Sequence, residues 1–218
     1  MSVRERIEKY LKENLVTDYG FTTLDDGAYG LHGAVSIVVR LSDAIMDEIG
    51  DKPTHTYFNH YRQVNAFIDR ILLGIGFILQ DEGYKYIPVA ASQSVSDDGY
   101  SGVYSHKKAA HLAGLGNVGR SNLFIHRWYG ARVRLGTVLT DCEFERPLKL
   151  CEDMCTDCMI CVENCPAGAI KGGAWTGVRE DIFNPKLCSD FMKKEYRLIG
   201  RGSVCGKCIC KGNSKPIK

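Results

Sequence analysis

All ten cysteines of the chain lie between Cys142 and Cys210, and the first 141 residues contain none. Part of this set forms the pattern C-x2-C-x2-C-x3-C-P, with Cys155, Cys158, Cys161, Cys165 and Pro166. This is the run that holds a cubane cluster in bacterial-type ferredoxins, where three cysteines bind one cluster and the fourth binds another. The spacing therefore predicts 4Fe-4S chemistry, and the fourth cysteine predicts a second cluster.

Downstream cysteines can complete both ligand sets. We assign one cluster to Cys155, Cys158, Cys161 and Cys210, and the other to Cys165, Cys188, Cys205 and Cys208. A standard second run would place its last cysteine where Lys211 or Gly212 stands, so Cys151 is the alternative to Cys210. Two C-x2-C pairs could also form a structural zinc site. Cys142 follows an apolar stretch and is interpreted as a small buried residue.

Composition limits the class of protein. With 44% apolar and 25% charged residues, the 218-residue chain is expected to be soluble and globular. The longest run of apolar residues and glycine, Ile71 to Leu79, is far shorter than the ~20 residues of a membrane span. No secretory signal is recognised, so we expect a cytoplasmic protein whose cysteines bind metal and form no disulfides. The net charge of +2 indicates no polyanion partner, although eight Lys/Arg follow Asp190 against one further acid, Glu195.

Hydrophobic periodicity predicts a mixed order of helices and strands. Helices are expected over residues 3–16, 42–50, 56–80 and 105–113, strands over 34–39, 84–91 and 131–140, and a loop over 92–102. The predicted fold class is α+β. We expect an α/β cofactor-binding domain over residues 1–141 and a two-cluster 4Fe-4S ferredoxin-like domain over residues 142–218.

Gly114, Gly116 and Gly119 form a G-x-G-x-x-G pattern. A dinucleotide-binding fingerprint must follow a strand. Here the preceding segment is predicted to be a helix, so this interpretation is rejected. The glycines allow close approach of the backbone either to another segment or to a large planar ligand, and both interpretations stay open.

Two motifs and the ferredoxin run together resemble the superfamily of epoxyqueuosine reductases and corrinoid reductive dehalogenases. The motifs are HKKAAHLAGLGNVGRSNL (106–123) and YGARVRLGTVLTD (129–141), and the resemblance covers roughly residues 92–208. More closely, the chain resembles the short double-cluster 4Fe-4S proteins of anaerobes. The resemblance implies a nitroreductase-like α/β domain that holds cobalamin beside a ferredoxin module, with electrons passing from cluster to cluster to cobalt.

The resemblance also implies roles for individual residues. Those expected to flank the cofactor are His106, Gly114, Leu115, Gly116, Asn117, Gly119, Arg120 and Ser121. The position of the general acid falls at Tyr100, with Tyr104 behind it, and the alternative for Tyr100 is a loop aromatic that covers the core. The C-terminal helical repeat that binds transfer RNA in full-length members is missing here, so transfer RNA is not expected as the substrate.

The leading hypothesis is a cytoplasmic oxidoreductase that passes electrons through two 4Fe-4S clusters to cobalamin, or less favourably to flavin. Its donor would be a ferredoxin or flavodoxin, and its substrate a small molecule or a corrinoid. The alternatives are a ferredoxin-like electron carrier and a reductive activator of another corrinoid protein. Nucleic-acid binding is remote because no aromatic residues alternate with the C-terminal Lys/Arg residues. A homodimer could complete the site.

Overall fold

The computed structural model describes residues 1–155 and 157–211, except for the side chains of Cys210 and Lys211. The chain divides into two compact units. Unit 1 comprises Met1–Val39, Val64–Leu115 and Arg134–Cys151, and unit 2 comprises Arg40–Gln63, Gly116–Val133 and the segment from Glu152 on. This division differs from the predicted boundary at residues 141 and 142, because two segments of the cysteine-free part of the chain pack with the cysteines.

Unit 1 is built on a four-stranded sheet with the order β1-β2-β6-β3. The strands are β1 (Asp18–Thr23), β2 (Gly33–Arg40), β6 (Val133–Thr140) and β3 (Tyr86–Val89). β1 pairs antiparallel with β2, and β3 pairs antiparallel with β6. Six consecutive residues of β2, beginning at Gly33, are buried. Because successive side chains of a strand point to opposite faces, both faces of this sheet are covered.

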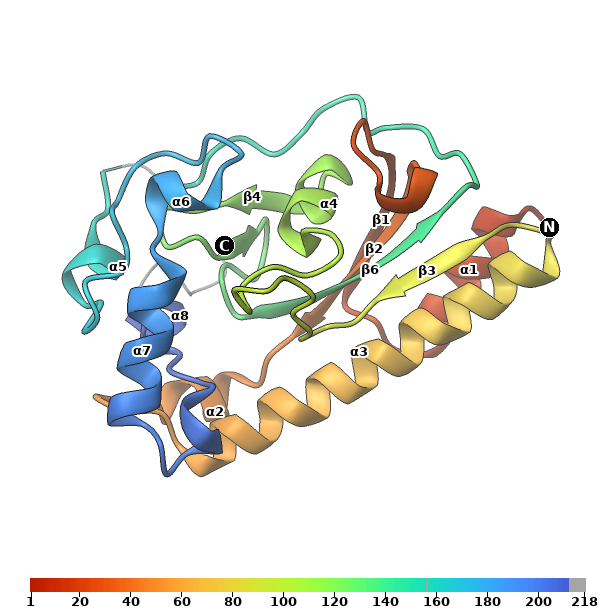
Figure 1. The fold of residues 1–218 in the computed structure, drawn as a ribbon. Coiled ribbons are helices and arrows are strands. Elements are labelled where there is room, and N and C mark those ends of the chain that lie inside the picture. Colours follow the sequence, from red (N-terminus) through yellow and green to blue (C-terminus); the bar gives the residue numbers. More distant parts are fainter. Residues whose placement is uncertain (156, 212–218) are drawn as a thin grey trace. The chain divides into compact units, whose positions relative to one another are not determined.

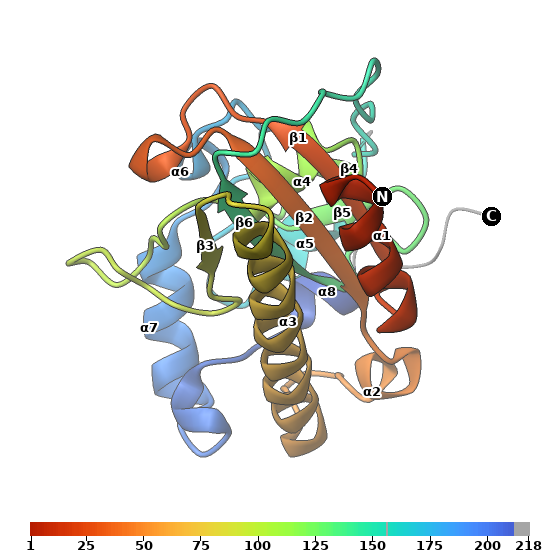
Figure 2. The same ribbon diagram turned by 90° about the vertical axis from the view of Figure 1, so that its right-hand side faces the viewer.

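Helices supply that cover, as Figure 2 shows: α1 (Val3–Glu13) and α3 (His55–Asp81) lie on one face of the sheet and α4 (His106–Leu112) on the other. α1 begins at a capping box between Ser2 and Glu5, which satisfies two backbone donors at the helix start. α3 carries fully buried side chains at Ile68, Ile71, Leu72, Ile75 and Leu79. This spacing of three and four residues is that of an amphipathic helix and places the core of unit 1 under α3.

By length and composition alone, α3 could cross a membrane, a test that core helices of soluble proteins also pass. In its most apolar window, 44% of the helix is buried inside the protein. Ile68 and Leu72 pack against Gly136 of β6, where any larger side chain would collide with them. These contacts make α3 part of the core of unit 1. The cytoplasmic location stays a prediction.

Unit 2 consists of short elements joined by long connections, as Figure 1 shows. They are α2 (Asp43–Asp47), the first turns of α3, the paired strands β4 (Gly116–Val118) and β5 (Phe124–His126), α5 (Ile160–Glu163), α6 (Arg179–Ile182), α7 (Pro185–Glu195), the 3-10 turn η2 (Gly200–Gly202) and α8 (Lys207–Lys211). α8 packs against α2 and α5, and η2 packs against α7. A second 3-10 turn, η1 (Ala28–Gly30), belongs to unit 1.

Arg132 ties two of the segments of unit 2 together. Its guanidinium donates to Asp43 Oδ1 at 3.1 Å and to Asp47 Oδ1 at 2.7 Å, both on α2. Its carbonyl accepts the backbone N–H of Leu41 at 2.8 Å. The Arg132 side chain is only 10% exposed, so the two carboxylates offset the cost of burying its charge. These bonds explain why residues 40–63 and 116–133 pack in one unit.

The predicted α+β class is confirmed as a mixture of helices and strands. Each predicted helix and strand is present, with ends that differ by up to three residues, and residues 92–102 form a loop. The prediction missed β1, the β4–β5 pair and the four helices of the cysteine-rich segment, of which α7 is as long as α1. The segment before the glycine pattern is helix α4, and Gly116 opens strand β4, where a dinucleotide fingerprint would open a helix.

Candidate iron-sulfur site

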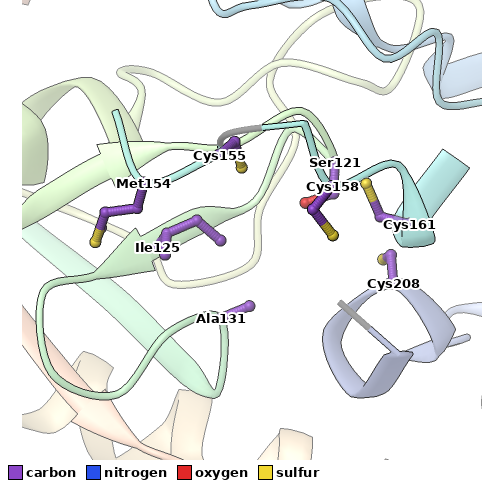
Figure 3. Close-up of a pocket in the computed structure, with 8 residues that line it drawn as sticks. All are labelled: Ser121, Ile125, Ala131, Met154, Cys155, Cys158, Cys161 and Cys208. Carbon is purple, nitrogen blue, oxygen red and sulfur yellow. The ribbon is translucent and has the colours of Figure 1, made fainter. Parts of the chain in front are cut away.

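The first three cysteines of the ferredoxin run line a pocket in unit 2, shown in Figure 3. About 450 Å³ of empty space lies in this pocket, part of it open to solvent, and its walls are Ser121, Ile125, Ala131, Met154, Cys155, Cys158, Cys161 and Cys208. Cys161 lies on α5, and Cys208 on α8 faces it. Within the described residues, no three His, Cys, Asp or Glu side chains are close enough to hold a single ion, so the thiols stand apart around the pocket.

A second group of thiols forms around Cys208. Burial first, and then the charges of Cys205, Cys188 and Cys165, raise the pKa of Cys208. The pKa of Cys188 is raised to about 11 by burial and by the charges of Cys205 and Cys165. Since such charge effects need short separations, these four thiols are neighbours. They are the four residues assigned from the sequence to the second cluster.

Cys208 therefore lies beside both groups of thiols. It lines the pocket of Cys155, Cys158 and Cys161, and it also interacts electrostatically with the second group. The sequence assigns Cys208 to the second cluster and Cys210 to the first. The side chain of Cys210 lies outside the described residues, so its ligand role stays a prediction.

The loop after β4 wraps around the first cysteine of the run. Gly119 lies so near Cys155 that a Cβ atom there would stand 2.9 Å from the sulfur. Burial raises the pKa of Cys155, and the backbone N–H of Arg120, which donates to this thiol, acts in the opposite direction. The Arg120 side chain donates to the carbonyl of Gly172 at 2.6 Å, which ties this loop to the chain that follows the run.

Backbone donors also reach cysteines of the second group. The N–H of Ala169 donates to Cys165 Sγ at 3.4 Å. The N–H of Lys207 donates to Cys205 and acts against the rise that burial causes in the pKa of this thiol. Hydrogen bonds to sulfur favour the thiolate, and in iron-sulfur proteins they help to set the reduction potential.

The chemistry of these donors fits iron-sulfur clusters. Buried thiols that raise one another's pKa resist deprotonation, and a group of thiolates needs positive charge beside it. A metal centre supplies that charge and keeps its ligand thiols deprotonated. Both groups of thiols in unit 2 thus have the composition of metal-binding sites, with Cys161 buried and their other described members half-buried.

Cys142 and Cys151 lie in unit 1. Cys142 is buried, as predicted for a packing residue, and burial raises its pKa. The thiol of Cys151 donates to the carbonyl of Gly114 at 3.3 Å. This bond gives Cys151 a structural role in unit 1, and whether Cys151 or Cys210 is a ligand stays open.

The residues expected to flank a large cofactor are divided between the units. Unit 1 holds His106, Gly114 and Leu115, and unit 2 holds Gly116, Asn117, Gly119, Arg120 and Ser121. Gly116 and Gly119 both approach Ile125 closely, so the close approach to another segment that the glycines permit is realised. The Asn117 side chain accepts the N–H of Val118 at 2.8 Å, and Ser121 lines the cysteine pocket.

His106 is bonded through both ring nitrogens in unit 1. Nδ1 lies 2.9 Å from Thr137 Oγ1 and Nε2 lies 3.1 Å from the carbonyl oxygen of Ala90. Burial lowers the pKa of His106 and keeps the ring neutral. The ring therefore joins α4 to β6 and to the end of β3, and its predicted contact with a cofactor stays a prediction.

Tyr100, the predicted general acid, lies in the 92–102 loop. It is half-buried, and its backbone N–H donates to Asp98 Oδ1 at 2.9 Å. Tyr104 donates its hydroxyl to Asp26 Oδ1 at 2.9 Å, and Asp26 also pairs with Lys108. Burial, followed by the bond to Asp26, raises the pKa of Tyr104, so this phenol stays protonated. The acid role of Tyr100 stays a prediction.

Sequence reasoning missed the apolar wall of the cysteine pocket, formed by Ile125, Ala131 and Met154. Ile125 and Ala131 precede the ferredoxin run by 24 residues or more, and nothing in their spacing signals a site. Met154 directly precedes Cys155, and this adjacency is the one available signal.

Comparison with known proteins agrees with this site. Residues 152–171 match the family model described as "4Fe-4S binding domain". The epoxyqueuosine reductase of Listeria monocytogenes is 32% identical over 117 residues, which cover 50% of this chain and 29% of that protein. The enzyme of the same name from Staphylococcus aureus is 35% identical over 97 residues, which cover 44% of this chain and 25% of that protein.

Over about half of its length, the chain is similar to epoxyqueuosine reductases. The resemblance inferred from the sequence is confirmed, and the chain carries a 4Fe-4S binding domain. The matched stretches span less than a third of the length of these curated relatives.

Solved structures show the shared fold. A catabolic reductive dehalogenase superposes with a TM-score of 0.73 at 17% identity. The superposition covers 97% of this chain and 32% of the dehalogenase chain. The epoxyqueuosine reductase from Streptococcus thermophilus superposes with a TM-score of 0.62 at 19% identity. This superposition covers 100% of the present chain and 69% of the reductase chain. The chain thus has the fold that these two solved enzymes share.

Proposed function

We propose that this protein is an iron-sulfur oxidoreductase that carries two 4Fe-4S clusters and delivers electrons to a corrinoid. The observation that carries the proposal is the arrangement of thiols in unit 2. Cys155, Cys158 and Cys161 share one pocket, while Cys165, Cys188 and Cys205 form a second group, and Cys208 neighbours both. Adjacent clusters bound at these positions would supply one-electron transfer.

The chain's own residues determine how such clusters are held. Backbone N–H groups from Arg120, Ala169 and Lys207 donate to cysteine sulfurs in both groups. Ile125 and Ala131 form an apolar wall of the pocket that Cys155, Cys158 and Cys161 line. Donors to sulfur raise the reduction potential of a cluster by stabilising its negative charge, and an apolar wall restricts access of water.

The corrinoid in this proposal is supported by the relatives. A solved dehalogenase of the shared fold is described as suggesting a mechanism for B12-dependent dehalogenation. In this chain, His106 bonds to Thr137 and Ala90, and Gly116 and Gly119 lie against Ile125. The predicted donor, a ferredoxin or flavodoxin, and the nitroreductase-like character of unit 1 belong to the same proposal.

The second candidate function is an electron carrier or an activator of another corrinoid protein. The internal contacts of His106, Gly116 and Gly119 favour it, because a carrier needs no cofactor beyond its clusters. One solved epoxyqueuosine reductase is in complex with an epoxyqueuosine-modified transfer RNA stem loop. For the present chain, transfer RNA is not proposed.

The test is electron paramagnetic resonance on anaerobically prepared protein, before and after addition of cob(II)alamin, with iron measured on the same sample. We expect about eight irons per chain for two 4Fe-4S clusters, and loss of the nitrogen splitting from the lower base of cobalamin. Clusters with an unchanged cobalt signal would support the carrier. Zinc in place of iron would refute both functions.

A matched pair of variants tests the ligand groups. Cys188→Ala removes a thiol of the second group, whereas Cys142→Ala removes a buried thiol of unit 1 that is assigned to no cluster. We expect Cys188→Ala to lose about half of the iron and Cys142→Ala to keep it all. Equal iron in the two variants would contradict the assignment of the second cluster.

A further inference from the structure

A basic surface lies where α7 ends. Between residues 193 and 201 the chain carries four basic residues and one acidic residue, Glu195. The basic patch consists of Lys193, Lys194, Arg197 and Arg201, all exposed. Glu195 pairs with Lys194 at 3.3 Å, with Lys194 82% exposed, so solvent screens that pair strongly. The patch therefore keeps a positive surface potential.

The backbone fixes the position of this patch. Gly200, Arg201 and Gly202 all have positive φ angles, of 57°, 56° and 72°. For arginine this conformation costs on the order of 1 kcal/mol and persists only where the surroundings impose it. Gly202 packs directly on the backbone of α7 at Met192 and Lys193, and Gly200 packs on the ring of Phe58. Arg201 is thus held beside the end of α7.

The patch is also close to the second group of cysteines. Cys188 lies on α7, five residues before Lys193, which corresponds to about 7.5 Å along a helix axis. Tyr196, between Lys194 and Arg197, is buried, its hydroxyl donates to the carbonyl of Asp51 at 3.2 Å, and it lies near enough to Cys205 for the two groups to interact electrostatically. The exposed basic side chains and two predicted ligands of the second cluster are therefore connected through one helix and one buried ring.

Leu198 is an exposed apolar residue within the patch, 84% accessible to solvent. A charged surface that also exposes an apolar contact residue is suited to a weak, transient protein interface. Opposite charge on the partner steers the encounter and contributes to its rate more than to its affinity. Proteins that bind single-stranded nucleic acid use exposed aromatic rings for stacking. Of the aromatic side chains beside this patch, Phe58 and Phe191 are half-buried and Tyr196 is buried.

We infer that the basic patch is the docking surface for an acidic electron-carrier protein, which delivers electrons to the cluster held by the second group of cysteines. This inference rests on the proposed function, because it needs a cluster at Cys188 and Cys205. One electron leaves the reduced carrier and enters that cluster, so the carrier is oxidised and the cluster is reduced, with no bond made or broken. The nearness of the patch to Cys188 and Cys205 gives a short path for this electron.

The test compares Lys193→Glu/Arg197→Glu with the control Lys9→Glu/Lys12→Glu, which makes the same charge change on the exposed face of α1 in unit 1. Each protein is reduced at low ionic strength by reduced flavodoxin, an acidic flavin carrier, or by photoreduced deazariboflavin, a small neutral reductant. Bleaching of the cluster absorbance gives the rate. We expect the patch variant to be reduced by flavodoxin roughly tenfold or more slowly than the wild type.

The control variant and the reactions with deazariboflavin should keep the wild-type rate. Equal flavodoxin rates in wild type and patch variant would overturn the docking surface. Slower reduction of the patch variant by both reductants would overturn it too, since the cluster itself would then be altered. A patch variant that loses binding to a transfer RNA stem loop while keeping its flavodoxin rate would make this a nucleic-acid surface and also overturn the inference.

Binding of flavodoxin, measured by fluorescence anisotropy at low salt, does not require iron. If the purified wild-type protein contains no iron, the proposed function is refuted. The binding measurement would still test the docking surface in that case. Weaker binding of the patch variant than of the control supports the surface, and equal binding of the two refutes it.

Discussion

The contact between Gly119 and Cys155 allows a prediction that links one methyl group to one cluster. In Gly119→Ala the new Cβ would lie 2.9 Å from Cys155 Sγ and 2.9 Å from Ile125 Cγ1. Ordinary contacts between carbon atoms are about 3.5–4.0 Å, so these neighbours must move by more than half an ångström. Such overpacking costs about 1–3 kcal/mol. Distances between metals and their ligands tolerate only about 0.2 Å, so Cys155 should leave its ligand position.

The assay is iron per chain together with the cluster absorbance of anaerobically purified protein. We expect Gly119→Ala to contain about half of the wild-type iron, because one of the two proposed clusters would be lost. The matched control is Gly173→Ala, also in unit 2, where the new Cβ would lie 3.4 Å from Ile182 Cγ2, an ordinary contact. Full iron in Gly119→Ala, or equal losses in both variants, would refute the reasoning.

Three further predictions concern the ligands and the buried histidine. Cys158→Ala should lose about half of the iron, and a protein that keeps all of it would contradict a cluster in the first pocket. Cys208→Ala and Cys210→Ala should remove different clusters, as their electron paramagnetic resonance spectra would show, and identical spectra would contradict the assignment. Burial lowers the pKa of His106 below its ordinary value of 6.5, so stability is full above about pH 6.5 and falls below it. His106→Gln should remove this loss, at most about 1.4 kcal/mol per pH unit, and parallel melting profiles of the two proteins down to about pH 5.5 would disprove it.

The long elements could be predicted because their patterns repeat several times. α3 shows its apolar face over seven turns, and β2 is rich in β-branched residues between Gly33 and Arg40. β4 and β5 have three residues each, and the helices α5 and α6 have four each. A segment this short contains no full period, so its sequence does not distinguish strand, helix and loop.

The sequence predicts a list of candidate ligands for the site, whereas the residues that form the walls of the pocket could not be predicted. Thiolate spacing is dictated by cluster geometry, so the run from Cys155 to Cys165 identified the chemistry directly. The contacts of Gly119 with Cys155 and of Arg132 with α2 join residues far apart in the chain and follow no local pattern. The grouping of cysteines from Cys142 onward predicts where candidate ligands lie in the chain. It does not predict that residues 40–63 and 116–133 pack with them.

Residues from outside the cysteine-rich segment help to hold the cysteines of unit 2 in place. Ser121, Ile125 and Ala131 line the cysteine pocket, and they come from the segment that Arg132 bonds to α2. A fragment of residues 142–218 would lack these walls and the backbone donor of Arg120 to Cys155. Its thiols would be exposed to water on the side that Ile125 now covers. The cysteine-free part of the chain is therefore a structural component of the iron-sulfur site, whatever else unit 1 binds.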